Sequence, residues 1–360
     1  RMQEIEKKLR RGMEANGIAG KAQEDIVKSI TSFALYGFPE SHAASFALIA
    51  YASAYLKCHY LAAFTAAMLN NQPMGFYNPA TLVKDAQRHG LKVKPVDVMY
   101  SDWPCTLERE GETWTLRLGM RYVKGLREEA AKSITEQRGR RLFTSMDDLV
   151  RRVPELRKSE LRMLAQLGAL NGIGKTVAGA GESVKANTHR RDALWQVERA
   201  TRPAGSLLKD LQDSSSVSPL KPMTAEERLL ADFQGAGMTV GRHPMAYRRK
   251  ELNARGVRTA AELRGAPDGK QVQIAGSVIC RQRPGTAKGF VFLSLEDETG
   301  IANAIVAPDL FRRERVTLVE EPFLLIEGKL QNQDGVISVK AENILPLMGP
   351  LAPSTSHNFR

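Results

Sequence analysis

Five short segments of β-like composition near the C-terminal end of the sequence constrain the fold most. They cover residues 271–283, 289–295, 300–306, 322–331 and 335–344. The turn-like strings EDETG and NQDG separate the second segment from the third and the fourth from the fifth. A helix is predicted between the third and fourth segments, at 308–318. Five strands with a helix after the third are typical of an OB barrel, which commonly binds single-stranded nucleic acid.

Aromatic and basic side chains fall together on this predicted barrel. Phe290 and Phe292 alternate onto one face of the second segment, where nucleic-acid bases could stack on them. Phe at alternate strand positions more commonly belongs to a core, so both interpretations stay open. The cations predicted to accompany the aromatic pair at DNA are Arg281, Arg283, Lys288 and Lys329.

Positive charge is concentrated before the barrel. The formal net charge is +12, and residues 117–199 contribute +8 of it, from 18 Lys and Arg against 10 Asp and Glu. A concentrated basic segment suggests a polyanionic partner, nucleic acid before membrane. A solvated basic surface without a ligand is the plainer alternative.

Two helix-hairpin-helix elements are predicted inside this basic segment, at residues 121–138 and 145–168. A glycine in the first hairpin would let backbone N–H groups approach a phosphate, and a pair of such elements grips a duplex without reading its sequence. Plain helical packing is the alternative. The residues predicted to contact the DNA backbone are Arg121, Lys124, Gly125 and Arg127 in the first element, and Arg157, Lys158 and Ser159 in the second.

Local start and stop signals give the helices of this region. Helices are predicted at about 126–138, 145–152 and 159–167. Ser145 fits a capping box that starts the second of them, and Ser159 is a plausible N-cap for the third. Two β-like segments, 91–99 and 113–119, precede the first helix.

The string YGFPESHAASF at 36–46 raises the question of catalysis through its Ser41–His42 pair. No third triad member or oxyanion site can be placed, so a catalytic role is not favoured. Ser41 is instead predicted to cap a helix that begins at His42. The N-terminus of that helix could face a triphosphate.

The string ALNGIGKT at 169–176 resembles a P-loop in which Ala169 replaces the first glycine. A P-loop follows a strand and opens a helix, whereas a helix precedes this string and a Gly-rich linker at 177–186 follows it. A structural role is therefore favoured over nucleotide binding. A second linker, rich in Ser and Pro, is predicted at 206–222.

Metal and nucleophile chemistry find no support in the sequence. Cys58, Cys105 and Cys280 lack CxxC spacing, which argues against a disulfide framework or a zinc site and for a reducing cytosol. The histidines are scattered, and no carboxylate pair indicates two-metal catalysis. No catalytic and no metal-binding residue is predicted in this chain.

Several long strings together resemble one known family. They are YGFPESHAASFALIAYASAYLKCHY, NQPMGFYNPATLVKDAQRHGLKVKPVDV, SDWPCTLE, GMTVGRHPM and RQRPGTAKGFVFLSLEDETG. They look like the C-terminal part of the error-prone C-family DNA polymerase of the ImuC type, a relative of the bacterial DNA polymerase III α subunit. The resemblance extends over essentially the whole chain.

This resemblance implies a multidomain α+β architecture. The metal-binding carboxylates of such enzymes lie in a palm domain that would precede Arg1, so Mg²⁺ would serve only the full-length polymerase. Ser41 and His42 would lie near the incoming nucleotide. The implied domains are 1–105 for the C-terminal part of the fingers, 106–200 for the tandem helix-hairpin-helix region, 201–267 for linker and connecting helices, 268–348 for the OB fold and 349–360 for a tail.

The resemblance also implies partners. DNA is one, as primer–template duplex and as single-stranded template. Residues 203–223 show no string like a clamp-binding peptide, so the sliding clamp would be reached only indirectly, through an ImuB-type clamp-adaptor protein. The implied location is the cytoplasm, at the nucleoid when active, with no membrane contact. An alternative is a protein-interaction module whose basic surface is incidental.

Overall fold

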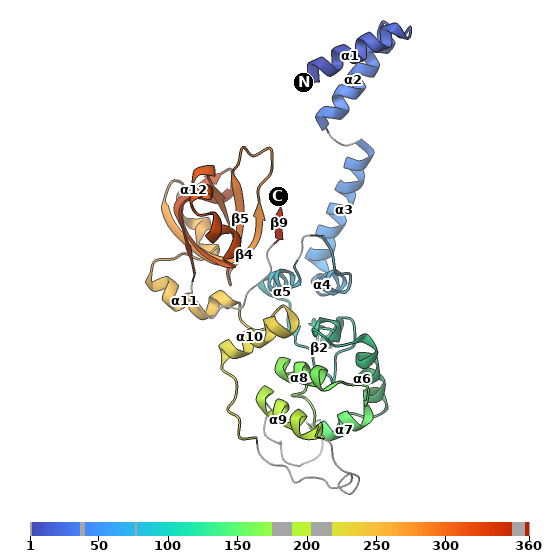
Figure 1. Cartoon of the computed structure of the whole chain (residues 1–360), viewed down its shortest axis with the longest axis vertical. Coiled ribbons are helices and arrows are strands. Elements are labelled where there is room, and N and C mark those ends of the chain that lie inside the picture. Colours follow the sequence, from blue (N-terminus) through green and yellow to red (C-terminus); the bar gives the residue numbers. More distant parts are fainter. Residues whose placement is uncertain are drawn as a thin grey trace. The chain divides into compact units, whose positions relative to one another are not determined.

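The structure is a computed structural model that describes residues 2–36, 40–75, 78–174, 189–202, 218–347 and 357–359. The chain divides into two compact units, 1–61 and 62–360 (Figure 1). The predicted linker at 177–186 lies outside the described residues, as does most of the one predicted at 206–222.

Three helices make up the first unit: α1 (Met2–Ala15), α2 (Lys21–Tyr36) and α3 (Glu40–His59). Helices α1 and α2 pack as a pair, with Met13 and Val27 buried between charged outer faces. The Gln23 side-chain amide donates to the carbonyl oxygen of Arg10 at 3.0 Å and ties the two helices together. Gly17 adopts a positive φ of 75° in the turn between them, a conformation that favours glycine.

Helix α3 begins at Glu40, two residues earlier than predicted. Ser41 therefore lies inside the first turn, and the prediction that it caps a helix starting at His42 is wrong. The Ser41 side chain lies outside the described residues, whereas His42 is exposed. Helix α3 carries apolar residues on all of its faces, and two of them, Leu48 and Tyr51, are 70% and 73% exposed.

The second unit opens with a helical region built around a small sheet. Its first elements are α4 (Leu61–Asn70), α5 (Pro79–Arg88), β1 (Val93–Lys94), β2 (Thr106–Glu110), β3 (Thr113–Arg117) and the 3₁₀ helix η1 (Met120–Tyr122). The strand order is β1-β3-β2, with β1 parallel and β2 antiparallel to β3. Strands β1 and β3 lie within the predicted β-like segments. Strand β2 has the charge-rich sequence TLERE and was not predicted.

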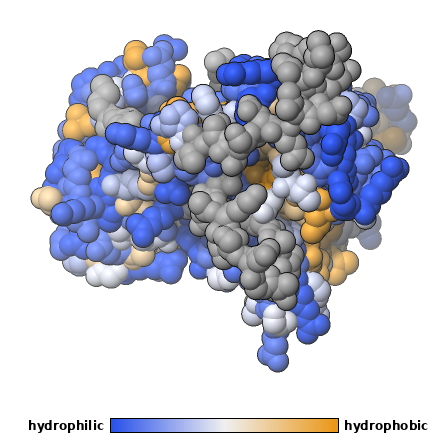
Figure 2. Space-filling view, turned by 90° about the horizontal axis from the view of Figure 1, so that it is seen from below, coloured by the Kyte–Doolittle hydropathy of each residue, from blue (hydrophilic) through white to orange (hydrophobic). Residues whose placement is uncertain are grey.

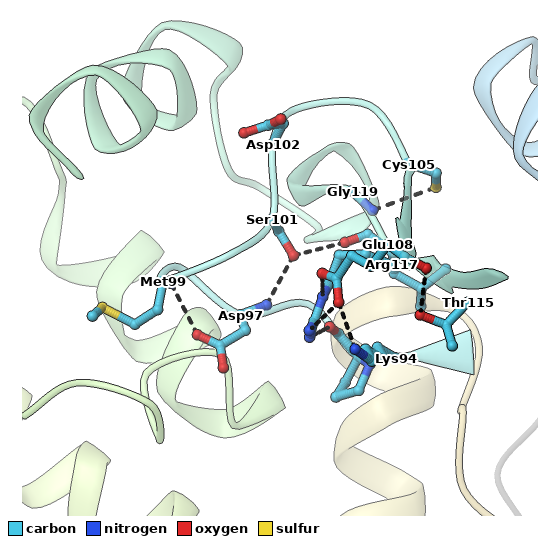
Figure 3. A network of polar contacts seen from close by, with 12 residues as sticks. Lys94, Asp97, Met99, Ser101, Asp102, Cys105, Glu108, Thr115, Arg117 and Gly119 are labelled. Atoms are coloured by element: carbon cyan, nitrogen blue, oxygen red, sulfur yellow. Dashed lines mark hydrogen bonds and ion pairs between the residues drawn. The ribbon is translucent and has the colours of Figure 1, made fainter. Parts of the chain in front are cut away.

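A polar network fixes the loop between β1 and β2 (Figure 3). The Ser101 hydroxyl donates to the Leu118 carbonyl oxygen at 2.8 Å and accepts from the Asp97 amide at 3.0 Å. Glu108 accepts from Lys94 at 2.6 Å and from Arg117, and the Arg117 hydrogen bond holds the pKa of Glu108 below its usual value. The network positions the chain that leads into η1 and the first hairpin.

The remaining helices are α6 (Glu128–Arg140), α7 (Met146–Arg152), α8 (Lys158–Leu167), α9 (Arg190–Ala200), α10 (Ala225–Ala236) and α11 (Pro244–Ala254). The three predicted helices of the basic segment are confirmed as α6, α7 and α8. The Ser145 hydroxyl caps α7 by accepting from the Asp148 amide at 3.0 Å, as predicted. Ser159 does not cap α8, because that helix begins at Lys158 and the N-cap position falls on Arg157.

The predicted barrel is confirmed. Its elements are β4 (Gln271–Gln282), β5 (Val291–Glu296), β6 (Ile301–Val306), α12 (Pro308–Arg313), α13 (Arg315–Glu320), β7 (Phe323–Gln333) and β8 (Val336–Pro346), preceded by the 3₁₀ helix η3 (Ala261–Gly265). The strands run in the order β5-β6-β8-β7-β4, and β4 pairs back with β5 to close the sheet. Inward-facing apolar residues such as Leu293, Ala304 and Leu330 form its core.

Two turn predictions are confirmed, and one element was missed. Asp334 and Gly335 have φ values of 50° and 84°, which make the tight β7–β8 hairpin of NQDG. In EDETG, an Asp297 carboxylate oxygen accepts from the Thr299 amide at 2.7 Å. The predicted tail contains a short strand, β9 (His357–Phe359), which pairs in parallel with the end of β4. Three residues are too few for a periodic signal.

Candidate nucleic-acid interface

One buried carboxylate joins the two predicted hairpins. Glu160, in the first turn of α8, is 2% exposed. It accepts from the backbone amide of Arg127 at 3.0 Å and from that of Arg157 at 2.8 Å. The Arg127 guanidinium adds two hydrogen bonds to the same carboxylate, at 2.9 and 3.0 Å. Glu160 therefore holds the N-terminal ends of α6 and α8 against each other.

Electrostatics keep this carboxylate ionised. Burial raises the pKa of Glu160, but the Arg127 guanidinium and the two backbone amides outweigh burial and lower the pKa to about 2. Sequence reasoning missed Glu160, although Glu three residues after an N-cap is a known capping signal.

The three cations predicted at the first hairpin each bind a group of this chain. Arg121 donates to the carbonyl oxygen of Asn70 at 2.5 Å, at the end of α4. Lys124 donates to the carbonyl oxygen of Phe233 at 3.1 Å, in the last turn of α10. Arg127 is held by Glu160. Each cation thus contributes to the packing of this region; Lys124 stays exposed, whereas Arg121 and Arg127 are partly buried.

The backbone of the first hairpin and the side chains of the second remain accessible. Gly125 has a φ of 79° and open space where a side chain would be, so the hairpin requires glycine. Arg157, Lys158 and Ser159 are all exposed at the start of α8. Lys158 shares the carboxylate of Glu198 with a second cation from α8, at 2.8 Å for the lysine.

The aromatic pair of the barrel faces outward. Phe290 is 36% exposed and Phe292 is 38% exposed, whereas Val291 and Leu293 between and beyond them are buried. The interpretation of the pair as core residues is therefore wrong. Phe292 also lies beside Ile305 of β6, which pairs with Lys340 of β8.

Phe292 and Ile305 begin a row of neighbouring residues across the strands, and two lysines continue it. Lys340 lies directly opposite Lys329 of β7, and both are exposed. Like charges directly opposite each other on neighbouring strands destabilise a sheet unless an anion compensates them. Lys329 was predicted as a DNA contact. Lys340 was missed, because only the register of β7 and β8 reveals that it is the neighbour of Lys329.

Arg281 differs from its prediction as a DNA contact, because this residue is only 9% exposed. Its guanidinium donates to the carbonyl oxygens of Leu318 at 2.5 Å and Glu321 at 2.6 Å. These carbonyls lie at the C-terminal end of α13, so Arg281 ties that helix to β4. Its place in the predicted DNA surface is not supported.

The other predicted cations of the barrel are exposed. Arg283 lies over the ring of Phe311, with 4.7 Å between the guanidinium carbon and the ring centroid. Lys288 is exposed in the β4–β5 loop, at a φ of 49°. Among the residues that Figure 2 colours by hydropathy, hydrophilic ones predominate, and hydrophobic ones form smaller separate patches.

The P-loop-like string has no phosphate cradle among its described residues. It follows α8, whose C-cap Gly168 has a φ of 79°. The Ala169 carbonyl accepts from the Val98 amide at 2.9 Å, and a side chain at Gly172 would collide with the Asp97 carboxylate. Lys175 lies outside the described residues.

Searches for a metal site and for a membrane span give negative results. Within the described ranges, no three His, Cys, Asp or Glu side chains gather as metal ligands. Among the helices of those ranges, none is long and apolar enough to cross a membrane.

A buried lysine marks the junction between α5 and the barrel. Lys84 is 7% exposed and donates to the carbonyl oxygen of Gly241 at 2.5 Å and to Gln87 at 2.8 Å. Nearby, Arg88 pairs with Glu296 of β5 at 2.9 Å. Burial, helped by the charge of Arg88 and opposed by that of Glu296, lowers the pKa of Lys84 from 10.5 to about 8.

This shift predicts a pH-dependent stability. Between pH 8 and 10.5 the unfolded chain binds a proton at Lys84 that the folded chain lacks, so the free energy of unfolding rises with pH there. From pH 8 to 9.5 we expect Lys84 to contribute a rise of about 2 kcal/mol. Denaturant unfolding of wild type and Lys84→Met at several pH values measures it. Lys92→Met, at an exposed lysine, is the control, and a wild-type rise shared by Lys84→Met would contradict the prediction.

Comparisons with known proteins agree with these features. The helix-hairpin-helix motif family matches residues 90–180, and the OB-fold nucleic acid binding domain family matches residues 272–347. An error-prone DNA polymerase of Anaeromyxobacter sp. (strain K) is 43% identical over 357 residues, which cover 97% of this chain and 30% of that relative. Those of Alkalilimnicola ehrlichii and Methylococcus capsulatus are 44% and 39% identical, over 93% and 94% of this chain.

Relatives named error-prone DNA polymerase thus match almost the whole chain. The chain spans only 30% to 33% of the length of these three relatives. The matched helix-hairpin-helix and OB-fold regions confirm that part of the predicted architecture.

Proposed function

We propose that this chain is the C-terminal region of an error-prone translesion DNA polymerase of the ImuC type, which binds DNA and partner proteins. The observation that carries the proposal is 43% identity to an error-prone DNA polymerase across 97% of this chain. In the full-length enzyme, palm carboxylates outside this chain would hold the Mg²⁺ ions that help join a deoxynucleotide to a primer end. The enzyme would act in the cytoplasm, at the nucleoid. This chain alone would bind DNA without extending a primer, and Ser41 and His42 would lie near the incoming nucleotide.

Duplex DNA would contact the helical region. The backbone around Gly125 and the exposed side chains of Arg157, Lys158 and Ser159 supply N–H groups, positive charge and a hydroxyl to phosphates. These groups contact only the backbone, so binding would not depend on base sequence.

Single-stranded template would cross the barrel. Phe290 and Phe292 offer exposed rings for base stacking, with Arg283 and Lys288 in the adjacent loop. The row from Phe292 to Lys329 crosses three strand spacings of about 4.8 Å each, or roughly 14 Å. That length accommodates a short stretch of backbone between a stacked base and the two lysines.

Charge reversal tests the duplex contact. The variant Arg157→Glu with Lys158→Glu is expected to bind a random-sequence duplex about tenfold more weakly. The plot of log K against log salt, which has a negative slope, should become shallower by about 2. Fluorescence anisotropy at several salt concentrations measures both. The matched control is Lys132→Glu with Arg140→Glu, two exposed cations of α6 that each pair with a glutamate four residues away. Equal losses in both variants would show a net-charge effect and count against the contact.

Truncation of the rings tests the barrel face. Phe290→Ala with Phe292→Ala is expected to weaken binding to an oligothymidine strand by about 30-fold or more, because two stacked bases at about 1–3 kcal/mol each contribute at least about 2 kcal/mol. Val316→Ala, at an apolar residue of α13 that is 68% exposed, should leave the affinity unchanged. Wild-type affinity in the double variant would remove the aromatic pair from the proposal.

A protein-interaction module is the second candidate. Two observations favour it. Arg121, Lys124 and Arg127 are held by groups of this chain, which leaves them less free for DNA. Helix α3 exposes large apolar side chains such as Leu48 and Tyr51. The partner would be an ImuB-type clamp adaptor, through which the sliding clamp is reached. Unchanged DNA affinity with lost adaptor capture in the Arg157→Glu, Lys158→Glu variant would favour this function over the first.

A further inference from the structure

Three guanidinium groups converge on one buried carboxylate in the basic helical region. Asp148 of α7 is 3% exposed. Arg141 lies 3.1 Å from its Oδ1, and Arg151 lies 3.3 Å from the same oxygen. Arg152 lies 3.2 Å from Oδ2. One negative charge therefore faces three positive charges.

Arg152 and Thr144 hold one oxygen of the buried carboxylate, Oδ2. Its side chain is 14% exposed, lies over the ring of Phe143, and donates to the carbonyl oxygen of Arg141 at 2.9 Å. The Thr144 amide donates to Asp148 Oδ2 at 3.2 Å. Although burial raises the pKa of Asp148, the Thr144 amide and Arg152 hold it below its usual value. Arg152 therefore already balances the charge of Asp148, and Arg141 and Arg151 supply the hydrogen bonds to its Oδ1.

Arg141 and Arg151 remain largely in solvent, at 64% and 76% exposure of their side chains. Because one oxygen of Asp148 holds both, their guanidinium groups stand close together despite equal charge. An anion with several oxygens would relieve the repulsion between them. The fork of N–H groups on arginine matches phosphate oxygens in a bidentate manner, which makes phosphate the best-fitting anion.

Arg141 lies far from the first hairpin along α6, whereas Arg151 lies on α7, six residues before Arg157 of the second hairpin. Helix α6 starts just after Arg127, which Glu160 holds, and ends just before Arg141. Its 13 residues span about 20 Å at 1.5 Å per residue. A phosphate at Arg141 is therefore a different phosphate from one at the first hairpin. A nucleic-acid backbone carries phosphates at both places.

We propose that Arg141 and Arg151 form a second binding site for nucleic-acid backbone phosphate, with Asp148 as the residue that positions them. The inference rests on the proposed function, because it takes the phosphate to belong to bound DNA. It adds a contact at the end of α6 opposite the first hairpin.

The test uses the 360-residue chain and a labelled random-sequence duplex at several salt concentrations. Arg141→Gln with Arg151→Gln is expected to weaken binding about tenfold and to make the negative slope of log K against log salt shallower by about 2. The variant with lysine at both positions keeps the charge but loses the fork, so its salt slope should stay and its affinity should fall about threefold. Lys132→Gln with Arg140→Gln, the matched pair on α6, should bind like wild type. The unfolding midpoint of each variant should stay close to that of wild type, because Arg152 remains on Oδ2 of Asp148 and the substituted side chains can still donate to Oδ1.

The outcomes separate this site from the proposed function. Wild-type affinity in the Arg141→Gln, Arg151→Gln variant, with weaker binding after charge reversal at Arg157 and Lys158, would overturn the site and leave the proposed function standing. A wild-type chain that binds no duplex would overturn the proposed function itself. An equal loss in the Lys132→Gln, Arg140→Gln control would also overturn the site. Unchanged DNA binding with lost binding to a polyglutamate probe would assign the pair to an acidic protein and contradict the inference.

Discussion

The Glu160→Gln variant is expected to unfold with a free energy about 3 kcal/mol lower than that of wild type. Removing the charge of Glu160 leaves Arg127 without its ion-pair partner and turns one acceptor oxygen into a donor that faces an N–H group. Part of the charge penalty is relieved, because the Arg127 side chain is 34% exposed to water. Urea unfolding followed by tryptophan fluorescence measures the loss, since the three tryptophans lie within residues 103–195.

The pH dependence of stability gives a second measure of the same contact. The folded pKa of Glu160 is about 2 and its usual value is 4.5, so its contribution is complete above pH 4.5 and is lost as pH falls toward 2. Wild type should lose up to about 3 kcal/mol across this window through Glu160, and Glu160→Gln should lack that part. Glu136→Gln, at an exposed glutamate of α6, should change stability by less than about 0.5 kcal/mol. Equal stability of the Glu160→Gln and Glu136→Gln variants would refute the role of Glu160.

The Gly328→Ala variant is expected to prevent the barrel from folding. A Cβ atom at Gly328 would lie 2.1 Å from the carbonyl oxygen of Lys340, on the facing strand β8. The contact is with backbone at an irregularity of the β7–β8 pairing, so a side-chain rotation cannot relieve it. Separating these strands removes a central ladder of the barrel, and we expect a loss of more than about 4 kcal/mol. Amide hydrogen exchange of β7 and β8 measures it.

Gly285→Ala is the matched control for Gly328→Ala. Gly285 lies in the β4–β5 loop with open space around its Cβ position and without a positive φ. Alanine there should leave protection of β7 and β8 unchanged, or should stabilise the chain by up to about 1 kcal/mol. Protected amides in both variants would show that the strands can shift to accept a methyl group at Gly328.

The predictions of secondary structure were correct where the signal lies within a few neighbouring residues. The barrel strands follow from the β-like composition of each segment, and the β7–β8 hairpin follows from two adjacent residues that tolerate positive φ, Asp334 and Gly335. Ser145 caps α7 through an amide three residues away. Strand β2 was missed because its charged side chains pair with neighbouring strands instead of alternating with apolar ones, as the ion pairs of Glu108 show.

The candidate site could be predicted only in part. The predicted residue types suit a nucleic-acid surface, but the contacts that hold some of them within the protein were not encoded nearby. Arg281 is buried because Leu318, 37 residues away, presents a carbonyl to it. Arg127 meets Glu160, which is 33 residues away, and Lys124 meets Phe233, which is 109 residues away.

The sequence by itself determined the kinds of elements, their order and the basic character of the helical region, because periodicity, capping and charge are read within a few residues. Tertiary structure alone decided which of the predicted cations remain free for a ligand. It also turned Phe290 and Phe292 outward and placed Lys340 opposite Lys329. The physical reason is that a charged or aromatic side chain is satisfied by whichever group packing brings to it, and that group is set by contacts between distant segments.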